Sequence, residues 1–180
     1  MIKYIALLRG INVGGKNIIP MPQLIKAFEQ RGFINVSTYI NSGNIIFDSD
    51  TKDEMAIKDV CEELITANFG LNISVGIITS RELTEALVNA PFWWNSDKEA
   101  KHNAIFVIPP MTSAEACEQI GEIKPEYEQI AYHGKVIFWS APLATFSRTR
   151  LTKIVQNKTM YNSLTIRNAN TTLKLAELAL

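Results

Sequence analysis

The order in which apolar runs and helix signals alternate most constrains the fold of this 180-residue chain. Short runs of strand length and composition are separated by two amphipathic helix patterns. The expected elements are a strand at 2–8, a helix from about 20 to 31, strands at 35–40 and 45–47, a helix from 51 to about 68, and a strand at 72–78. The order β-α-β-β-α-β is that of a ferredoxin-like α+β unit. We therefore predict a ferredoxin-like βαββαβ subdomain over residues 1–79.

Residues 80–180 repeat this order in part. The expected elements are a helix from 79 to 90, a strand at 104–108, a helix from 112 to 121, strands at 127–132 and 136–140, a helix near 150–158, and a last helix from about 168. This pattern predicts a second, related α+β subdomain that ends in C-terminal helices. Because no Gly/Ser-rich or Pro-rich linker separates the halves, we expect both to pack as one compact unit.

Composition narrows the class of protein. Apolar residues make up 47% of the chain and charged residues 20%, which excludes a disordered chain or a disulfide miniprotein. The chain has no apolar run of membrane-spanning length and no signal-peptide pattern, so we expect a cytoplasmic protein without a membrane partner. Cys61 and Cys117 lie at helical spacing with apolar residues and lack metal-site spacing. We expect both to be buried small hydrophobes, and we expect neither a metal site nor a cofactor.

The charges are distributed unevenly along the chain. Eighteen Lys and Arg balance eighteen Asp and Glu, yet residues 48–63 hold seven acids and two bases. Between Glu128 and Glu177 there are seven bases and no acid. One interpretation is a local cationic site on a neutral protein. The alternative is that folding interleaves the two segments into an ordinary mixed surface.

A glycine-rich loop follows the first predicted strand. Residues 10–16 match the spacing of a phosphate-binding loop, but Asn17 stands where that motif has Ser or Thr. Pro20 and Pro22 also place the next helix later than the motif requires, so we reject a nucleotide hydrolase. Successive loop amides with Arg9 and Lys16 nearby still suit an anion. The alternative is a connection that needs positive φ at its glycines.

Three further segments supply candidate ligand-binding residues. Asparagines flank both the glycine-rich loop and the predicted hairpin turn at 41–44, where they either close turns or form a polar rim. Two predicted helix starts, near 147–150 and 167–168, combine basic side chains with free backbone amides. The alternative there is ordinary capping. The candidate ligand-binding residues are Arg9, Asn12, Gly14, Gly15, Lys16, Asn17, Asn41, Ser42, Asn44, Ser147, Arg148, Arg150, Arg167 and Asn168.

Conventional catalytic motifs are missing from the sequence. The two histidines, His102 and His133, are isolated, and neither a Gly-x-Ser-x-Gly elbow nor a Cys-His signature occurs. Trp93 and Trp94 form either an exposed stacking platform or a buried seal between the two halves. The sequence therefore names no catalytic residue and leaves open whether the protein is an enzyme.

Three blocks of the sequence resemble a known family. They are Leu-Leu-Arg-Gly-Ile-Asn-Val-Gly-Gly-Lys-Asn at 7–17, Thr-Tyr-Ile-Asn-Ser-Gly-Asn-Ile at 38–45, and Thr-Ile-Arg-Asn-Ala-Asn-Thr-Thr at 165–172. They are similar to the bacterial family called domain of unknown function 1697. The resemblance implies a bacterial cytoplasmic protein with an α+β core, and it implies no activity.

We interpret the chain as an anion-binding module whose partner is a phosphorylated small molecule, a nucleotide or an RNA backbone. The first alternative is a transferase or hydrolase that acts on a phosphate-containing substrate. The second alternative is a homodimeric interaction protein.

Overall fold

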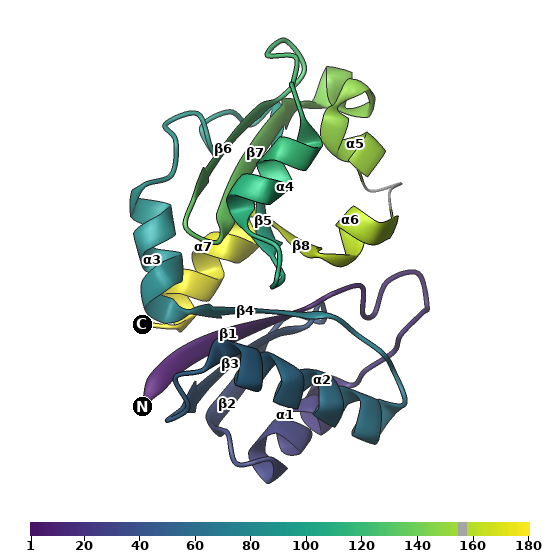
Figure 1. Ribbon diagram of the computed structural model, residues 1–180, viewed down its shortest axis with the longest axis vertical. Coiled ribbons are helices and arrows are strands. Elements are labelled where there is room, and N and C mark those ends of the chain that lie inside the picture. The colour runs from purple at the N-terminus through teal and green to yellow at the C-terminus, as the bar shows by residue number, and fades with distance from the viewer. Residues whose placement is uncertain (155–157) are drawn as a thin grey trace. The chain divides into compact units, whose positions relative to one another are not determined.

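The computed structural model describes residues 1–154 and 158–180 (Figure 1). The described chain forms two compact units. The first comprises Met1–Arg81 with Leu175–Leu180, and the second comprises Glu82–Lys174. Each unit contains a four-stranded antiparallel sheet, which confirms the predicted α+β class. The domain limits predicted at residues 79 and 80 stay a prediction.

The first unit has the predicted β-α-β-β-α-β order. Its elements are β1 (Ile2–Leu8), α1 (Met21–Gln30), β2 (Ile34–Tyr39), β3 (Asn44–Ser49), α2 (Glu54–Phe69) and β4 (Val75–Thr79). The strands lie in the order β2-β3-β1-β4, and β1 pairs with both β3 and β4. Because β1 is central, it carries almost only apolar side chains, and residues 4–8 are all buried.

Alternation along β1 determines which face of the first sheet carries the helices. Tyr4, Ala6 and Leu8 belong to a buried cluster that also contains Phe28 of α1 and Leu64 of α2. Since alternate residues of a strand point to the same face, α1 and α2 cover that face together (Figure 1). The loops described below adjoin the end of β1 and the start of β3, where Leu7 pairs with Asn44.

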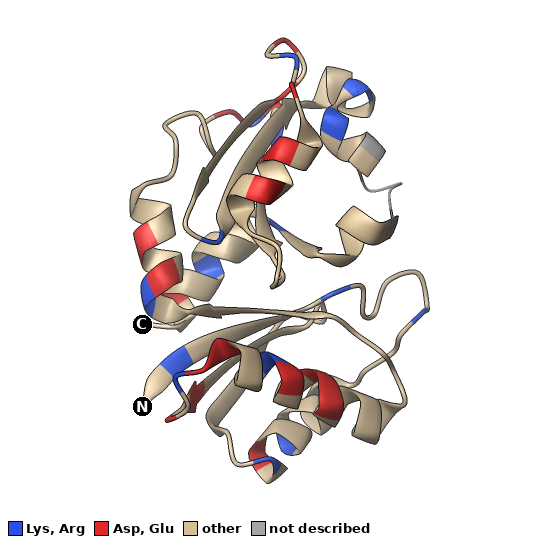
Figure 2. Ribbon diagram, in the orientation of Figure 1, with Lys and Arg blue, Asp and Glu red and all other residues tan. Residues whose placement is uncertain are grey.

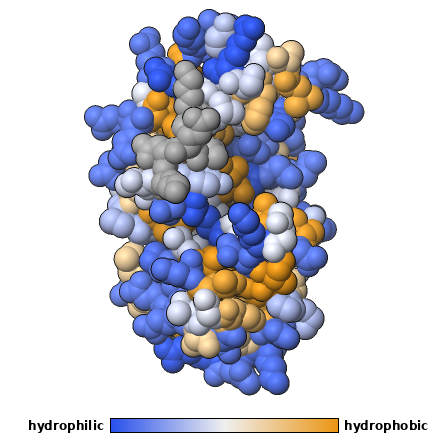
Figure 3. All heavy atoms as spheres, turned by 90° about the vertical axis from the view of Figure 1, so that its right-hand side faces the viewer, coloured by the Kyte–Doolittle hydropathy of each residue, from blue (hydrophilic) through white to orange (hydrophobic). Residues whose placement is uncertain are grey.

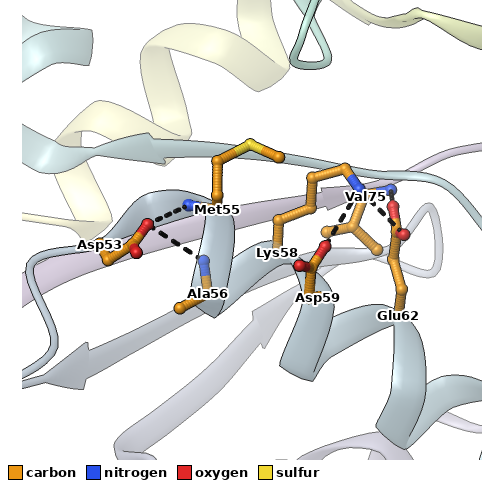
Figure 4. A network of polar contacts seen from close by, with 7 residues as sticks. All are labelled: Asp53, Met55, Ala56, Lys58, Asp59, Glu62 and Val75. Carbon is orange, nitrogen blue, oxygen red and sulfur yellow. Dashed lines mark hydrogen bonds and ion pairs between the residues drawn. The ribbon is translucent and has the colours of Figure 1, made fainter.

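The start of α2 differs from the prediction. The sequence suggests a capping box from Thr51 to Glu54, but the capping side chain is Asp53. Its carboxylate accepts hydrogen bonds from the backbone N–H groups of Met55 (3.0 Å) and Ala56 (3.2 Å), as Figure 4 shows. Asp is as good a cap as Thr, and the Thr51 carbonyl oxygen instead accepts from the Tyr4 hydroxyl (2.9 Å).

The acidic segment belongs mainly to α2, where Figure 2 shows it in red. One of its acids, Glu62, interacts with other groups of the first unit. Lys58 Nζ lies 3.0 Å from Glu62 Oε2, and the backbone N–H of Val75 donates to Glu62 Oε1 at 3.0 Å (Figure 4). Glu62 therefore ties α2 to the start of β4.

The second unit repeats the strand order of the first. The elements that follow β4 are α3 (Ser80–Val88), β5 (Ala100–Val107), α4 (Ser113–Ile120), β6 (Gln129–His133), β7 (Val136–Pro142), the 3-10 segment η1 (Leu143–Arg148), α5 (Arg150–Ile154), α6 (Lys158–Asn162), β8 (Leu164–Asn168) and α7 (Ala169–Leu178). The first two residues of α3 and the last four of α7 belong to the first unit. The sheet order β6-β7-β5-β8 matches β2-β3-β1-β4 when β5 takes the place of β1.

Strand β8 is missing from the sequence prediction. Leu164–Asn168 is mostly buried and pairs antiparallel with β5, with Ile166 opposite Ile105. The β-branched Thr165 and Ile166 favour this strand, whose end overlaps the helix start predicted at 167–168. Part of the helix predicted near 150–158, residues 155–157, lies outside the described residues.

The two faces of the second sheet carry different side chains. Ile105, Ile137 and Trp139 face a cluster that includes residues of α4 and α5. The alternate positions of β5 and β7 include His102 and Ser140, which point to the other face. On that face Trp94 is buried and packs edge-on against Phe138, with ring centroids 5.0 Å apart.

Candidate functional site

The glycine-rich loop of the first unit is a miniature hairpin. Val13 and Lys16 form an isolated antiparallel bridge around Gly14 and Gly15, whose φ angles are 58° and 73°. Positive φ at both central residues defines the tight turn that matches strand twist, and glycine adopts it without strain. The turn requirement alone explains both glycines.

Asn12 joins this loop to the neighbouring β2–β3 hairpin. Its Nδ2 donates to the carbonyl oxygens of Asn41 (2.8 Å) and Ile19 (3.0 Å), and its Oδ1 accepts from the Ile19 N–H (2.8 Å). The backbone N–H of Leu8 also donates to the Gly43 carbonyl oxygen at 2.8 Å. The structure therefore brings the predicted loop and hairpin residues together at one end of the first sheet.

The other asparagines of this region also bond to the chain itself. Asn17 Nδ2 donates to the Gly10 carbonyl oxygen at 2.9 Å. The buried Asn44 donates to the Tyr39 carbonyl oxygen (3.0 Å) and to the Ser42 hydroxyl oxygen (2.9 Å). These contacts fit the turn-closing interpretation, because each amide holds a backbone or hydroxyl oxygen of its own loop.

The surface of this region is partly apolar. Val13, Ile18 and Ile40 are 64%, 59% and 49% exposed, and Lys16 is exposed beside them. Figure 3 shows hydrophobic residues at the surface among hydrophilic ones. The loop end of the first unit therefore presents apolar side chains beside the exposed Lys16.

In the second unit, a carboxylate of the protein itself occupies the helix start near 147–150. The side chain of Glu128 is 2% exposed and accepts hydrogen bonds from the backbone N–H groups of Arg150 and Leu151, the latter at 3.4 Å. The Trp139 indole N–H donates to the same carboxylate at 2.8 Å. The anion that this helix start attracts is thus built into the fold.

The basic side chains of this segment lie at the surface. Ser147, Arg148 and Arg150 are exposed. The Arg148 guanidinium is 5.7 Å from the centre of the Tyr127 ring, and Arg150 Nε donates to the Glu122 carbonyl oxygen at 3.3 Å. Both arginines therefore contact the loop between α4 and β6.

Arg167 lies on strand β8 and is 8% exposed. Its Nη1 donates to the Thr165 hydroxyl oxygen (3.0 Å) and the Ile166 carbonyl oxygen (2.9 Å). Burial lowers the pKa of the guanidinium to about 10, because the charged form loses hydration. The helix predicted to start at 167–168 begins at Ala169. Asn168 caps it, since its Oδ1 accepts from the Thr171 N–H (2.8 Å).

The acid-free stretch meets acids from other parts of the second unit. Lys135 Nζ lies 2.8 Å from Glu82 Oε1, and His133 Nε2 lies 3.7 Å from Glu85 Oε1. Helix α4 adds further acids to this unit, as Figure 2 shows. This arrangement fits the interleaved interpretation of the charge asymmetry.

Two hollows of the second unit were not anticipated from the sequence. The larger, here called the Asn pocket, has a volume of ≈ 740 Å³ and lies at the start of α7. The smaller, here called the Ser140 pocket, has a volume of ≈ 340 Å³. Asp97, Ala100 and His102 line both. The Asn pocket is lined by Asn95, Asp97, Lys98, Ala100, Lys101, His102, Asn103, Asn168, Ala169 and Asn170.

His102 lines both pockets and accepts or donates a hydrogen bond at each ring nitrogen. Its Nδ1 lies 2.5 Å from Ser140 Oγ and its Nε2 lies 2.6 Å from the Asp97 carbonyl oxygen. His102 is isolated in the sequence because Ser140 is 38 residues away, and only the pairing of β5 with β7 brings the two together. A serine hydroxyl on an imidazole held from its other side has the geometry of an activated nucleophile.

Neither metal sites nor membrane helices are seen in the part of the chain that the structure describes. No group of three His, Cys, Asp or Glu side chains there could hold a metal ion. Within the same residues, no helix is long and apolar enough to span a membrane.

Comparisons with known proteins place the fold. The family described as "Protein of unknown function (DUF1697)" matches residues 1–138. The structure of conserved bacterial protein SP0830 from Streptococcus pneumoniae is similar, with a TM-score of 0.87, 27% identity and 99% of each chain covered. An unknown protein from Galdieria sulphuraria aligns with 10% identity over 92% of this chain and 95% of its own, at a TM-score of 0.26. No curated protein matches the chain.

Proposed function

This chain belongs to the DUF1697 family of proteins of unknown function, and from its geometry we propose that it binds an anionic small molecule. The observation that carries this proposal is the Asn pocket. Its volume of ≈ 740 Å³ lies within the range of roughly 300–1,000 Å³ typical of small-molecule sites. The proposal keeps the anion-binding function inferred from the sequence and assigns it to the second unit.

The lining of the Asn pocket suits a phosphate or carboxylate group. Four of its lining residues are asparagines, whose side-chain amides carry N–H donors, and the exposed Lys98 and Lys101 supply positive charge. Ala169 and Asn170 are the first residues of the ten-residue helix α7, whose N-terminal end attracts negative charge. Asp97 is the single acid among the lining residues, and its Oδ1 accepts from the Glu99 N–H at 2.8 Å.

A hollow of this kind favours a small molecule over a nucleic-acid strand. Proteins that bind single strands present a long cationic groove with aromatic stacking platforms. No Phe, Tyr or Trp lines the Asn pocket, and its lining residues surround one hollow. A sugar phosphate or a nucleotide therefore fits this pocket better than an RNA backbone does.

Thermal unfolding with inorganic phosphate, ribose 5-phosphate, AMP and a short RNA tests the proposal. A ligand that binds only the folded protein at 100 times its Kd stabilises it by about 2.7 kcal/mol. We expect the small anions to raise the Tm of the wild-type protein. Lys98→Glu removes that rise because it reverses the charge at the pocket.

The matched control is Lys26→Glu, which reverses an exposed lysine on α1 in the first unit. It keeps the ligand-dependent rise in Tm. The proposal is wrong if none of the small anions shifts the Tm, or if both variants respond as the wild-type protein does. A shift with RNA alone that falls steeply with salt would assign the site to nucleic acid instead.

A further inference from the structure

Three polar side chains form a row across one face of the second sheet. Gln129 of β6 lies opposite Ser140 of β7, and Ser140 lies opposite His102 of β5. Residues directly opposite each other in antiparallel strands share a face, with Cβ atoms about 4.5–5.5 Å apart. All three line the Ser140 pocket. The register thus places a hydroxyl group between an imidazole and an amide.

The hydrogen bonds of His102 determine how its neutral ring is used. The Asp97 carbonyl oxygen can only accept, so Nε2 of the neutral ring carries the hydrogen and donates to it. Nδ1 is then the acceptor, and the Ser140 hydroxyl donates to it at 2.5 Å. The base is therefore oriented with its lone pair on the serine, as nucleophilic catalysis requires.

We propose that Ser140 and His102 are the nucleophile and general base of an esterase site that cleaves carboxylic esters with a short acyl group. This inference stands on the Ser140 pocket and does not depend on anion binding in the Asn pocket. The Ser140 pocket is also lined by Trp93, Pro125, Ala141 and Pro142, which offer an apolar seat for an acyl chain. Its volume of ≈ 340 Å³ lies at the lower end of the roughly 300–1,000 Å³ typical of small-molecule sites, which suits an ester with a short acyl chain.

The reaction proceeds in two halves. Ser140 Oγ attacks the ester carbonyl carbon while its proton moves to His102 Nδ1, and the Gln129 amide donates to the oxyanion that forms. The carbon–oxygen bond to the leaving alkoxide breaks, and the alkoxide takes the proton from His102. Water then attacks the acyl-serine with His102 again as base, which releases the acid and restores the Ser140 hydroxyl.

The test uses a fluorophosphonate, which reports nucleophilic serines directly. Ser140 Oγ forms a bond to phosphorus, fluoride leaves, and the proton goes to His102. Mass spectrometry of the whole folded protein and its peptides is expected to show one adduct, on Ser140. The adduct disappears in Ser140→Ala, a change that removes one oxygen atom from a nearly buried side chain.

His102→Gln separates the base from the structural bond. The glutamine amide can still accept from the Ser140 hydroxyl, but it cannot take a proton. We expect its labelling to be roughly 10²-fold slower or more, as for loss of a general base. The matched control is His133→Gln, which removes the other histidine and leaves the rate unchanged.

Gln129→Ala provides a second, independent variant. Because Gln129 is exposed on strand β6, its loss leaves the packing intact. We expect hydrolysis of p-nitrophenyl butyrate to slow by about 10² in kcat, as when an oxyanion donor is removed. If Ser140 in the folded wild-type protein takes no label, or His102→Gln labels as fast as wild type, the pair is structural and the proposal is overturned.

Discussion

The carboxylate of Glu128 accepts the indole N–H of Trp139 at 2.8 Å inside the second unit. The same carboxylate accepts the backbone N–H groups at the start of α5. One buried acid therefore links the central strand β7 to the segment that carries Arg148 and Arg150. Its carboxylate takes the position that an external anion would occupy at this helix start.

Removal of this acid is expected to destabilise the protein. Glu128→Ala leaves three donors without their acceptor, two of them in buried hydrogen bonds, at a cost of roughly 3 kcal/mol in the free energy of unfolding. Urea denaturation followed by tryptophan fluorescence measures it. Glu126→Ala, an exposed acid two residues earlier, is the control and changes stability by less than about 0.5 kcal/mol. Equal stability of the two variants would contradict the assigned role.

Gly43 is expected to be irreplaceable for steric reasons. Its φ is 76°, and a Cβ there would lie 2.6 Å from the Leu8 Cβ and 2.8 Å from the Ile11 Cδ1. Gly43→Ala therefore adds overpacking, about 1–3 kcal/mol, to the cost of a left-handed backbone. Gly14→Ala is the control because its φ is 58° but no atom lies within 4 Å of the added Cβ. In thermal denaturation, the Tm of Gly43→Ala should be well below that of Gly14→Ala, and the reverse order would refute the packing argument.

The capping box of α4 predicts a pH dependence. The Thr112 backbone N–H and hydroxyl both donate to Glu115 Oε2 at 2.8 Å, and they lower the pKa of this carboxyl below its usual 4.5. Because the folded pKa is lowered, the cap stabilises α4 above the unfolded pKa. The stabilisation is lost as pH falls through the folded pKa. The protection factors of the α4 amides, which are corrected for the intrinsic pH dependence of exchange, should therefore fall further in acid for wild type than for Thr112→Ala. An identical acid response in both proteins would contradict it.

The two thiols are expected to differ in reactivity. Cys61 is fully buried, and burial raises the pKa of its thiol far above the usual value. Cys117 is half-buried, and burial also raises the pKa of its thiol. In the folded protein, Cys117→Ser should therefore show no reaction with a disulfide reagent at pH 8. Full reaction in urea confirms that Cys61 is intact. Rapid native labelling of that variant would show that Cys61 is accessible.

The sequence predicts the fold well because its signals are local. Apolar runs, prolines at the start of α1 and the Thr112–Glu115 box act over a few residues, and each matches an observed element. β8 escaped prediction because Leu164–Asn168 is short and adjoins a helix. Its strand character depends on pairing with β5, which is distant in sequence.

The candidate site was less predictable, because its residues come together through strand pairing between distant parts of the sequence. The loop and hairpin of the first unit do meet, and Asn12 joins them as one would expect from adjacent strand ends. The pairing of His102 with Ser140 comes from strand register, and no motif signals it. Glu128 had a faint signal, since it is the last acid before the acid-free stretch.

The central claim is that the Asn pocket, and not the glycine-rich loop, binds the anion. An amide NMR titration of the full chain with ribose 5-phosphate and inorganic phosphate tests it most directly. We expect saturable shifts in residues 95–103 and 168–170, with Lys16 and its neighbours unmoved. Saturable shifts confined to residues 9–17, or none at all, would contradict it.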